Sequence, residues 1–227
     1  MVGSCTDLAN AASAELAVKP LLRGVLHQGA FVAAIIVAPL LILSADGSRT
    51  RLAAAVFALS VIGCFGVSAL YHRVTWTPSV RRWMRRADHA GVYLLIAGTY
   101  TPVALLVLDG AWGRVILTVV WAGALAAILL KFVWLDAPKW VAAGIGLALG
   151  WVAVFALPQL VDRLDVAAVT LLIAGGLLYS IGAVVYARRK PDPLPEVFGY
   201  HEVFHALTIA AAACQYVAIA IFVIRPA

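Results

Sequence analysis

Two histidines, His201 and His205, stand one helical turn apart near the start of the last long apolar stretch of the chain. Residues at positions i and i+4 lie on the same face of a helix, so both imidazoles can reach one ion. Such a pair is a common ligand set for a first-row metal. Because Glu202 follows His201, the segment also reads H-E-x-x-H, which is the pattern of soluble metalloproteases.

A second group of polar residues consists of Ser68, His72 and Asp88. Ser68 lies one turn from His72 on the same helical face, and Asp88 begins a strongly apolar stretch. Alone, His72 is typical of an interfacial histidine, and Asp88 of a charge near a helix N-terminus that pairs with a neighbouring arginine. Ionisable groups in membrane spans cost roughly 2.5–3.5 kcal/mol and usually face a partner inside the bundle. Together with the histidine pair, these residues therefore favour a metal site.

The composition indicates an integral membrane protein. The 227 residues are 64% hydrophobic and 12% charged, whereas charged residues make up roughly a quarter of ordinary soluble domains. The net charge of +6 comes from Lys and Arg in connections between apolar runs, which fits membrane topology better than a nucleic-acid surface. We therefore expect no nucleic-acid partner. The three cysteines lack C-x-x-C spacing and predict neither a disulfide nor a thiolate metal site.

Seven apolar stretches are long enough to cross a bilayer, which requires roughly 20 residues per helix. We place these spans at about residues 24–44, 52–72, 89–108, 113–133, 139–158, 165–187 and 200–224. They predict an all-α fold, a seven-helix transmembrane domain over residues 21–227, after a lead-in over residues 1–20. The lead-in lacks a basic region followed by an apolar core, so we expect no cleavable signal peptide. The two long connections, 73–87 and 188–199, are basic.

The distribution of Lys and Arg predicts the orientation. If the N-terminus is cytoplasmic, twelve of these residues lie on the cytoplasmic side and five on the other. An excess of Lys and Arg on the cytoplasmic side is the usual pattern, so we expect this orientation in the inner cell membrane. This orientation places His72, Asp88 and His201 at one depth near the cytoplasmic boundary. Three imidazoles and one carboxylate would surround a single ion if the second, third and seventh spans are neighbours.

Three histidine ligands leave one tetrahedral position open for water, which is typical of catalytic rather than structural zinc. Zinc can lower the pKa of a bound water to about 7. Asp88 would then act as the general base, and Ser68 would orient Asp88 or polarise a substrate carbonyl.

The remaining polar residues are weaker candidates. For Glu202 we favour a solvated or helix-capping role over that of a general base. His27 is expected to be a packing or interfacial residue, and His89 to point to a different face from Asp88. Pro102 should kink or end the outer part of the third span. Close helix packing by small residues explains three glycines of the fifth span, namely Gly144, Gly146 and Gly150.

The ordered combination of Ser68-x-x-x-His72, Arg86-Ala87-Asp88-His89 and His201-x-x-x-His205 resembles the bacterial hemolysin III family. The lead into the first span, Lys19-Pro20-Leu21-Leu22-Arg23-Gly24, is similar to that family as well. The family belongs with the progestin and adipoQ receptors and, more distantly, with alkaline ceramidases. The resemblance implies seven helices, a cytoplasmic N-terminus, a zinc ion on the three histidines, and Asp88 with Ser68 around a zinc-bound water. Relatives vary between the last two histidines, so the H-E-x-x-H match is interpreted as coincidental.

Three functions follow from these patterns. The favoured hypothesis is a zinc-dependent hydrolase that cleaves a lipid amide or ester at the inner leaflet, with a membrane lipid as its partner. The first alternative is a membrane receptor or sensor in which a structural zinc ties the spans together. The second alternative is a pore-forming cytolysin.

Overall fold

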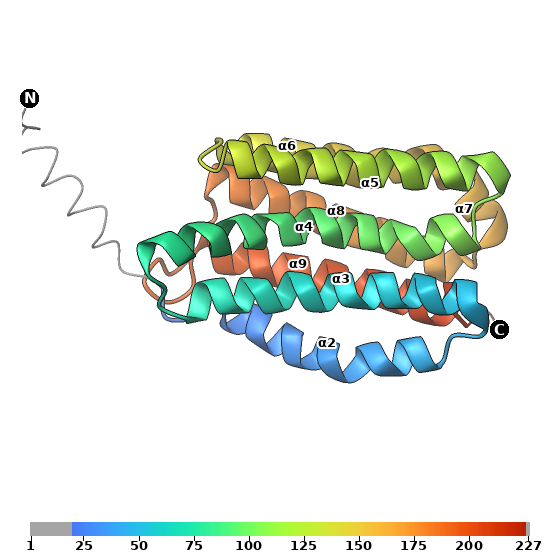
Figure 1. The fold of residues 1–227 in the computed structure, drawn as a ribbon, viewed down its shortest axis with the longest axis horizontal. Helices are drawn as coiled ribbons and strands as arrows, with labels where there is room; N and C mark the ends of the chain where they lie inside the picture. Colours follow the sequence, from blue (N-terminus) through green and yellow to red (C-terminus); the bar gives the residue numbers. More distant parts are fainter. Residues whose placement is uncertain (1–19, 226–227) are drawn as a thin grey trace, which may run out of the picture.

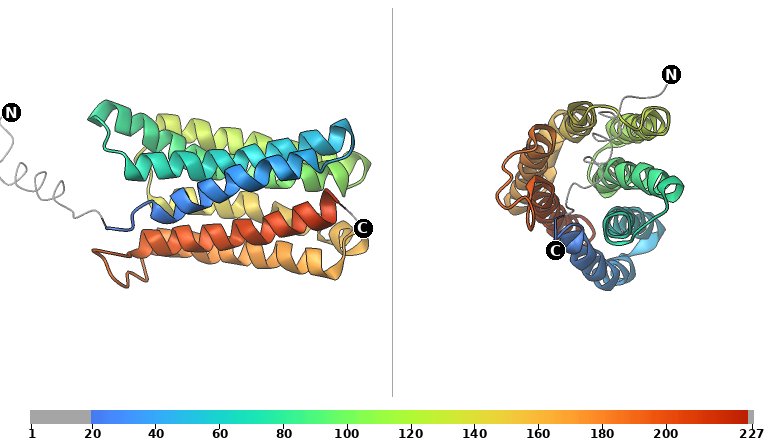
Figure 2. Two further views of the ribbon diagram at one scale, coloured as in Figure 1. Left: turned by 90° about the horizontal axis from the view of Figure 1, so that it is seen from below. Right: turned by 90° about the vertical axis from the view of Figure 1, so that its left-hand side faces the viewer.

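The computed structural model describes residues 20–225, and seven of its helical segments are long and apolar enough to cross a membrane. These segments run side by side along the length of the molecule (Figure 1) and are arranged as a ring when viewed end-on (Figure 2). Within the described range, the only pairing of β type is an isolated bridge between Leu194 and Phe198. The predicted all-α, seven-span bundle is confirmed. Apart from Pro20, the predicted lead-in lies outside the described residues.

The first four spans are α2 (Val25–Leu43), α3 (Gly47–Arg73), α4 (Pro78–Leu106) and α5 (Gly110–Val133). The fifth consists of α6 (Lys139–Gly150), the 3₁₀ turn η1 (Trp151–Ala156) and α7 (Leu157–Arg163). The last two are α8 (Val166–Arg188) and α9 (Tyr200–Val217), the latter continued by the π-helical turn η2 (Ala218–Val223). Most bounds agree with the predicted spans within a few residues.

The start of α4 corrects the sequence prediction. The predicted basic connection over residues 73–87 is wrong, because α3 and α4 are separated only by residues 74–77. Pro78 occupies the first turn of α4, where its missing N–H is not needed. The following turns are helical although they carry four arginines, and the Arg86 guanidinium lies 5.1 Å from the centre of the Trp83 ring. Hydropathy detects only the apolar part of such a helix. At its other end α4 passes through Pro102 and stops at Leu106.

A side chain of α4 forms hydrogen bonds with the backbone where the fifth span departs from α-helical geometry. Pro158 has no N–H, so it cannot donate the α-helical hydrogen bond to the carbonyl of Val154, four residues earlier. The Tyr100 hydroxyl accepts a hydrogen bond from the Ala153 N–H at 2.7 Å and lies 2.6 Å from the Gly150 carbonyl, to which it can donate. Irregular backbone at membrane depth requires such internal partners. Tyr100 therefore fixes the position of this span relative to α4.

The ring closes where the first and last spans meet. The Tyr216 hydroxyl on α9 donates to the Val37 carbonyl on α2 at 3.0 Å. Buried side chains of α2, α3 and α9 form one apolar cluster, and a second cluster joins α4, α5 and the fifth span. Large apolar side chains such as Leu43, Leu129 and Val133 point outward and are exposed, as lipid-facing residues should be. α9 is thus held beside α2, and α2 beside α3, which positions the candidate site.

Candidate metal centre

His72, His201 and His205 come together at one end of the bundle, which we call the histidine end. One ring nitrogen of each lies within 4.8 Å of one ring nitrogen of the other two. The Nε2 atoms of His72 and His201 are 3.1 Å apart. His72 and His205 are buried at 8% and 2% exposure. α3 supplies one imidazole and α9 supplies two, so residues 129 positions apart in the sequence form one cluster.

The two histidines of α9 are positioned by a helix cap beneath them. The Gly199 N–H donates to Glu202 Oε2 at 2.9 Å, which fixes the first turn of α9. The other carboxylate oxygen, Oε1, lies 2.6 Å from Arg23 Nε. Glu202 is fully buried, so the predicted capping role is confirmed and the predicted solvent exposure is wrong. Because both oxygens are engaged, the carboxylate is not placed to serve as a general base.

The third histidine is held by the chain that enters α2. Gly24 adopts φ +81°, and a Cβ added to it would lie 2.6 Å from the Cβ of His72. Only glycine fits both the left-handed backbone and this close approach. The preceding residues are tied down as well, since the N–H groups of Leu21 and Leu22 donate to the carbonyls of Glu196 and Val197. The segment Pro20–Gly24, which we call the strap, therefore packs directly against the cluster.

Asp88 and Ser68 lie beside this cluster and line a cavity of about 380 Å³ inside the ring. The Ser68 side chain is a hydrogen-bonding neighbour of the Asp88 carboxylate. α4 approaches α3 closely here, because a Cβ at Gly91 would lie 3.2 Å from the Cα of Cys64. His201 and His205 line the same cavity, so the carboxylate and the imidazoles face a shared space. The structure thus brings together all five predicted site residues.

His27 and His89 complete the set of imidazoles. His27 is buried, and its ring stacks on that of His205 with 3.6 Å between centroids, so the predicted packing role is confirmed. His89 lines the cavity, and its Nδ1 is buried without a hydrogen-bond partner among the described residues. Neither residue joins the three-histidine group. Both free cysteines, Cys64 and Cys214, also lie outside it, and Cys5 is not among the described residues.

The residues present fit a metal ion. His205 Nδ1 is buried and has no hydrogen-bond partner within the described range. His72 and His201 direct like ring nitrogens at each other, an arrangement in which only one of the two atoms can act as donor. A cation between the three rings would satisfy nitrogens that otherwise compete. Three imidazoles suit Zn²⁺ and other first-row ions alike. The three histidines could therefore hold a metal ion.

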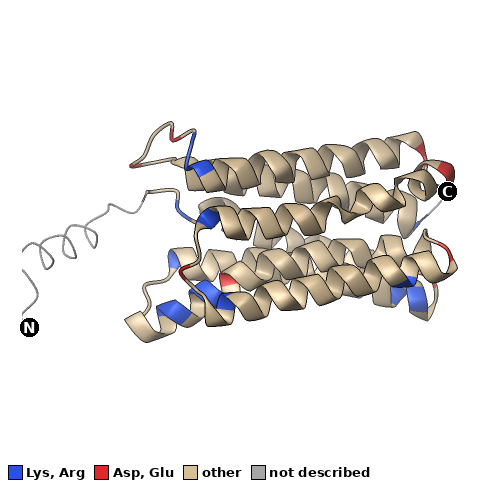
Figure 3. Cartoon of the chain, turned by 90° about the horizontal axis from the view of Figure 1, so that it is seen from above, with Lys and Arg blue, Asp and Glu red and all other residues tan. Residues whose placement is uncertain are grey.

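Lys131 is a cavity residue that sequence reasoning missed. It is one of the twelve Lys and Arg residues that the sequence places on the cytoplasmic side, yet it lies in the last turn of α5, is 2% exposed and lines the cavity. The signal in the sequence is that Lys131 is the only Lys or Arg between Val115 and Val133. Lys and Arg gather mainly at the histidine end of the bundle, as Figure 3 shows. This general bias concealed Lys131, which is buried and lines the cavity.

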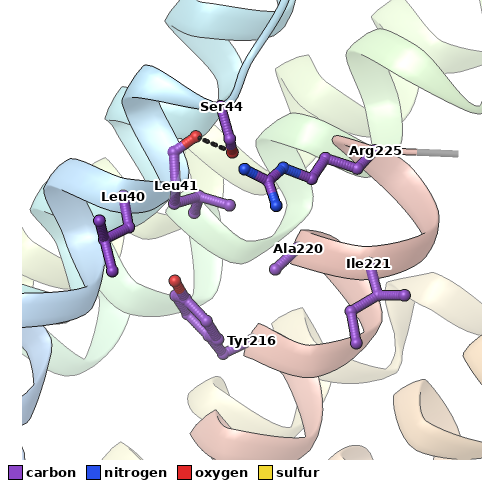
Figure 4. A pocket seen from close by; sticks show the side chains of 7 residues that line it. All are labelled: Leu40, Leu41, Ser44, Tyr216, Ala220, Ile221 and Arg225. Atoms are coloured by element: carbon purple, nitrogen blue, oxygen red, sulfur yellow. Dashed lines mark hydrogen bonds between the residues drawn. The ribbon is translucent and has the colours of Figure 1, made fainter.

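A second hollow, of about 330 Å³, lies at the opposite end between α2 and α9. Figure 4 shows the Arg225 guanidinium reaching across it toward Ser44, whose hydroxyl donates to the Leu41 carbonyl at 2.9 Å. Its lining holds no His, Cys, Asp or Glu. Of these two hollows, only the central cavity is therefore lined by side chains that commonly bind metals.

Comparison with known proteins gives a family and several relatives. The family model described as Haemolysin-III related matches residues 16–216. Hemolysin-3 of Bacillus cereus is 31% identical over 193 residues, which cover 83% of this chain and 85% of that protein. A hemolysin-3 homolog of Bacillus subtilis is 28% identical over 170 residues, covering 75% and 76%. The human monocyte to macrophage differentiation factor is 25% identical over 199 residues, covering 85% and 79%.

Proposed function

The chain belongs to the Haemolysin-III related family, and from its buried histidine cluster we propose that it is a zinc-dependent hydrolase of a lipid amide or ester. The observation that carries the proposal is that His201 and His205 line a mainly apolar cavity together with Asp88 and Ser68, while His72 completes the three-histidine group behind them. A lipid chain fits such walls, and its polar group would then lie at the histidines.

The orientation of the bundle supports action at the inner leaflet. The histidine end carries eleven of the Lys and Arg residues in the described range, and the opposite end carries five. Positively charged connections face the cytoplasm in most membrane proteins. We therefore place the histidine end at the cytoplasmic side of the cell membrane, which puts the N-terminus inside.

Each residue has a role that follows from its position. His72, His201 and His205 would hold the zinc ion, which supplies a Lewis acid and lowers the pKa of a water molecule bound to it. Asp88 takes a proton from the attacking water and passes it to the leaving nitrogen or oxygen as the acyl bond breaks. Ser68 orients the Asp88 carboxylate. Water adds to the acyl carbon, so the products are a carboxylic acid and an amine or alcohol.

A structural metal is the second candidate, and a specific observation favours it. The cluster links α3 to α9, and the strap and His27 pack against it from α2. An ion at this junction would hold three spans together even without turnover. A pore is less well supported, because ion-selective pores are lined by rings of charge or carbonyl groups. Among the described residues that line this cavity, Lys131 is the only Lys or Arg.

The first experiment measures metal and turnover in the same preparations. We expect about one zinc ion per chain in the wild type by elemental mass spectrometry, as a single three-histidine site holds one ion. His205→Ala should lose the zinc, whereas His89→Gln, which removes a cavity histidine outside the cluster, should keep it. Absence of stoichiometric metal from wild-type protein purified without chelator would overturn both metal proposals.

Turnover then separates the two metal roles. Asp88→Asn should keep the zinc and lower hydrolysis of lipid amides or esters about 10²–10⁴-fold, the usual effect of removing a general base. Asp162→Asn, a matched change at an exposed site of the opposite end, should have wild-type turnover. If zinc-loaded protein hydrolyses no lipid amide or ester across a broad panel, the hydrolase proposal is wrong and the structural role of the metal remains.

A further inference from the structure

Lys131 is a buried cation with no hydrogen-bond or ion-pair partner among the described residues. It lines the cavity at 2% exposure, and within the described range it makes no hydrogen bond or ion pair. The carboxylate whose charge reaches it, Asp136, lies on the surface and pairs with Arg85 at 2.7 Å. Asp88 lines the same cavity, but its hydrogen-bonding neighbour is Ser68. The charge of Lys131 is therefore left for a group that enters the cavity.

The position of Lys131 on its helix does not explain its burial. A lysine in the last turn of a helix is favoured by the helix dipole, and at a membrane boundary its long side chain normally extends into water. Lys131 instead turns into the bundle. Ionisable residues inside membrane spans cost free energy and usually face a functional partner. A ligand with negative charge would supply that partner.

The groups around Lys131 suit an anion. Three cations, Lys131, Arg85 and Lys139, act on His89, whose buried Nδ1 has no partner in the described part of the chain. A neutral imidazole with its proton on Nδ1 offers a donor to the same ligand. Lys139 is already engaged, because its ammonium hydrogen-bonds the Tyr200 hydroxyl and lies 4.8 Å from the centre of the Tyr186 ring. Lys131 and His89 remain available.

The rest of the cavity suits a hydrocarbon chain. Its walls come from α4, the fifth span, α8 and α9, and most of the lining side chains are apolar. The predicted close packing at Gly144, Gly146 and Gly150 is wrong. A Cβ at Gly144 or Gly150 would meet nothing within 4 Å, and one at Gly146 would only reach Ile96 Cδ1 at 4.0 Å. Gly146 and Gly150 line the cavity, so the missing side chains widen it.

We propose that this cavity binds a lipid whose headgroup carries an anionic oxygen group, phosphate or carboxylate, held by Lys131 and His89. The hydrocarbon chain lies between α4, α6 and α8, and the bonds next to the headgroup lie near the histidines. The inference rests on the proposed function in one respect, since it names an anionic lipid as the substrate class of that hydrolase. Binding itself requires neither metal nor turnover.

The test counts bound lipid by native mass spectrometry on the purified full chain in a neutral detergent. The probes are phosphatidylglycerol and a diacylglycerol with identical acyl chains, which lacks the anionic phosphate. The wild type should prefer phosphatidylglycerol about tenfold or more, as expected for one charge-assisted hydrogen bond in a buried site. Lys131→Gln should abolish the preference and Lys131→Arg should retain it. Lys190→Gln, the same change of charge on an exposed lysine, should retain it too.

An unchanged preference in Lys131→Gln would overturn the proposal, as would displacement of the lipid by inorganic phosphate alone, which would indicate a soluble anion. If Lys131→Gln does not fold, cross-linking of the wild-type protein tests whether the lipid headgroup lies in the cavity. A phosphatidylglycerol with a photoreactive group next to its headgroup should label α4 and α5 inside the cavity. Labelling confined to the exposed Arg188–Lys190 surface would contradict the inference. If the wild type itself shows no preference for phosphatidylglycerol but hydrolyses neutral lipids, this substrate class is wrong and the proposed function still stands.

Discussion

Two ion pairs at opposite ends of the bundle show how differently this chain uses charge. At the histidine end, Arg23 pairs with Glu202, whose side chain is 1% exposed. At the other end, Arg163 pairs with Asp109, whose side chain is 69% exposed. Both pairs join segments distant in sequence. Only the first lies against a cluster of buried imidazoles.

The fold depends on polar contacts more strongly at the histidine end than at the opposite end. Water solvates Asp109 and Arg163 when they separate, so an exposed pair of this kind contributes little. Burying Glu202 is costly unless its charge is neutralised, and removing one partner of a buried pair leaves the other uncompensated. The Arg23–Glu202 pair also ties the strap to the first turn of α9. Stability and metal site should therefore be coupled at the histidine end and independent at the other.

The largest effect is expected for Glu202→Gln. The amide oxygen can still cap Gly199, but Arg23 loses its counter-charge, so we expect a loss of about 3–5 kcal/mol in the free energy of unfolding. The double variant Arg23→Gln with Glu202→Gln removes both charges and should recover a large part of that loss. Unfolding in detergent measures these changes. Glu196→Gln, in the exposed loop before α9, is the matched control and should be neutral. Additive losses in the double variant would show that the two charges are not coupled.

The next effect concerns the fit of the strap against His72. Gly24→Ala places a methyl group on His72 and forces an alanine into a left-handed backbone, whereas Gly47→Ala imposes a similar backbone strain, at φ +78°, with no neighbour within 4 Å. We expect Gly47→Ala to cost about 1 kcal/mol and Gly24→Ala about 1–3 kcal/mol more. Zinc content should fall only in Gly24→Ala. Equal losses in both variants, with zinc retained, would show that the strap does not position His72.

The sequence predicted the elements well because bilayer thickness constrains them directly. Seven runs of about 20 apolar residues and the i, i+4 spacing of His201 and His205 are local properties, and both predictions agree with the structure. Which helices are neighbours in the bundle is not a local property of the sequence. That α3 and α9 meet at one ion-sized cluster depends on how seven helices close into a ring, which no single stretch encodes.

The errors share a physical origin. Hydropathy reports the preference of a segment for lipid, so it ended the third span where α4 leaves the apolar region, although the backbone remains helical to Pro78. The count of Lys and Arg likewise placed Lys131 on the cytoplasmic side, and the position of Glu202 near the membrane boundary suggested a solvated or capping role. Both are buried, because a bundle interior can solvate polar groups with its own partners or with a ligand.

The smallest effect is expected at the exposed pair. The side-chain hydrogen bond from Arg163 holds the pKa of Asp109 below its ordinary value in the folded protein. A carboxyl with a depressed folded pKa stabilises the fold above its unfolded pKa, and that contribution is lost as pH falls through the folded value. Asp109→Asn should therefore lower Tm slightly at pH 7. The difference from wild type should shrink as pH falls below about 4 and vanish below the depressed folded pKa. Thermal unfolding followed across this pH range measures it. A difference that grows at acidic pH would contradict the assigned role, and a large one at pH 7 would erase the contrast between the two ends.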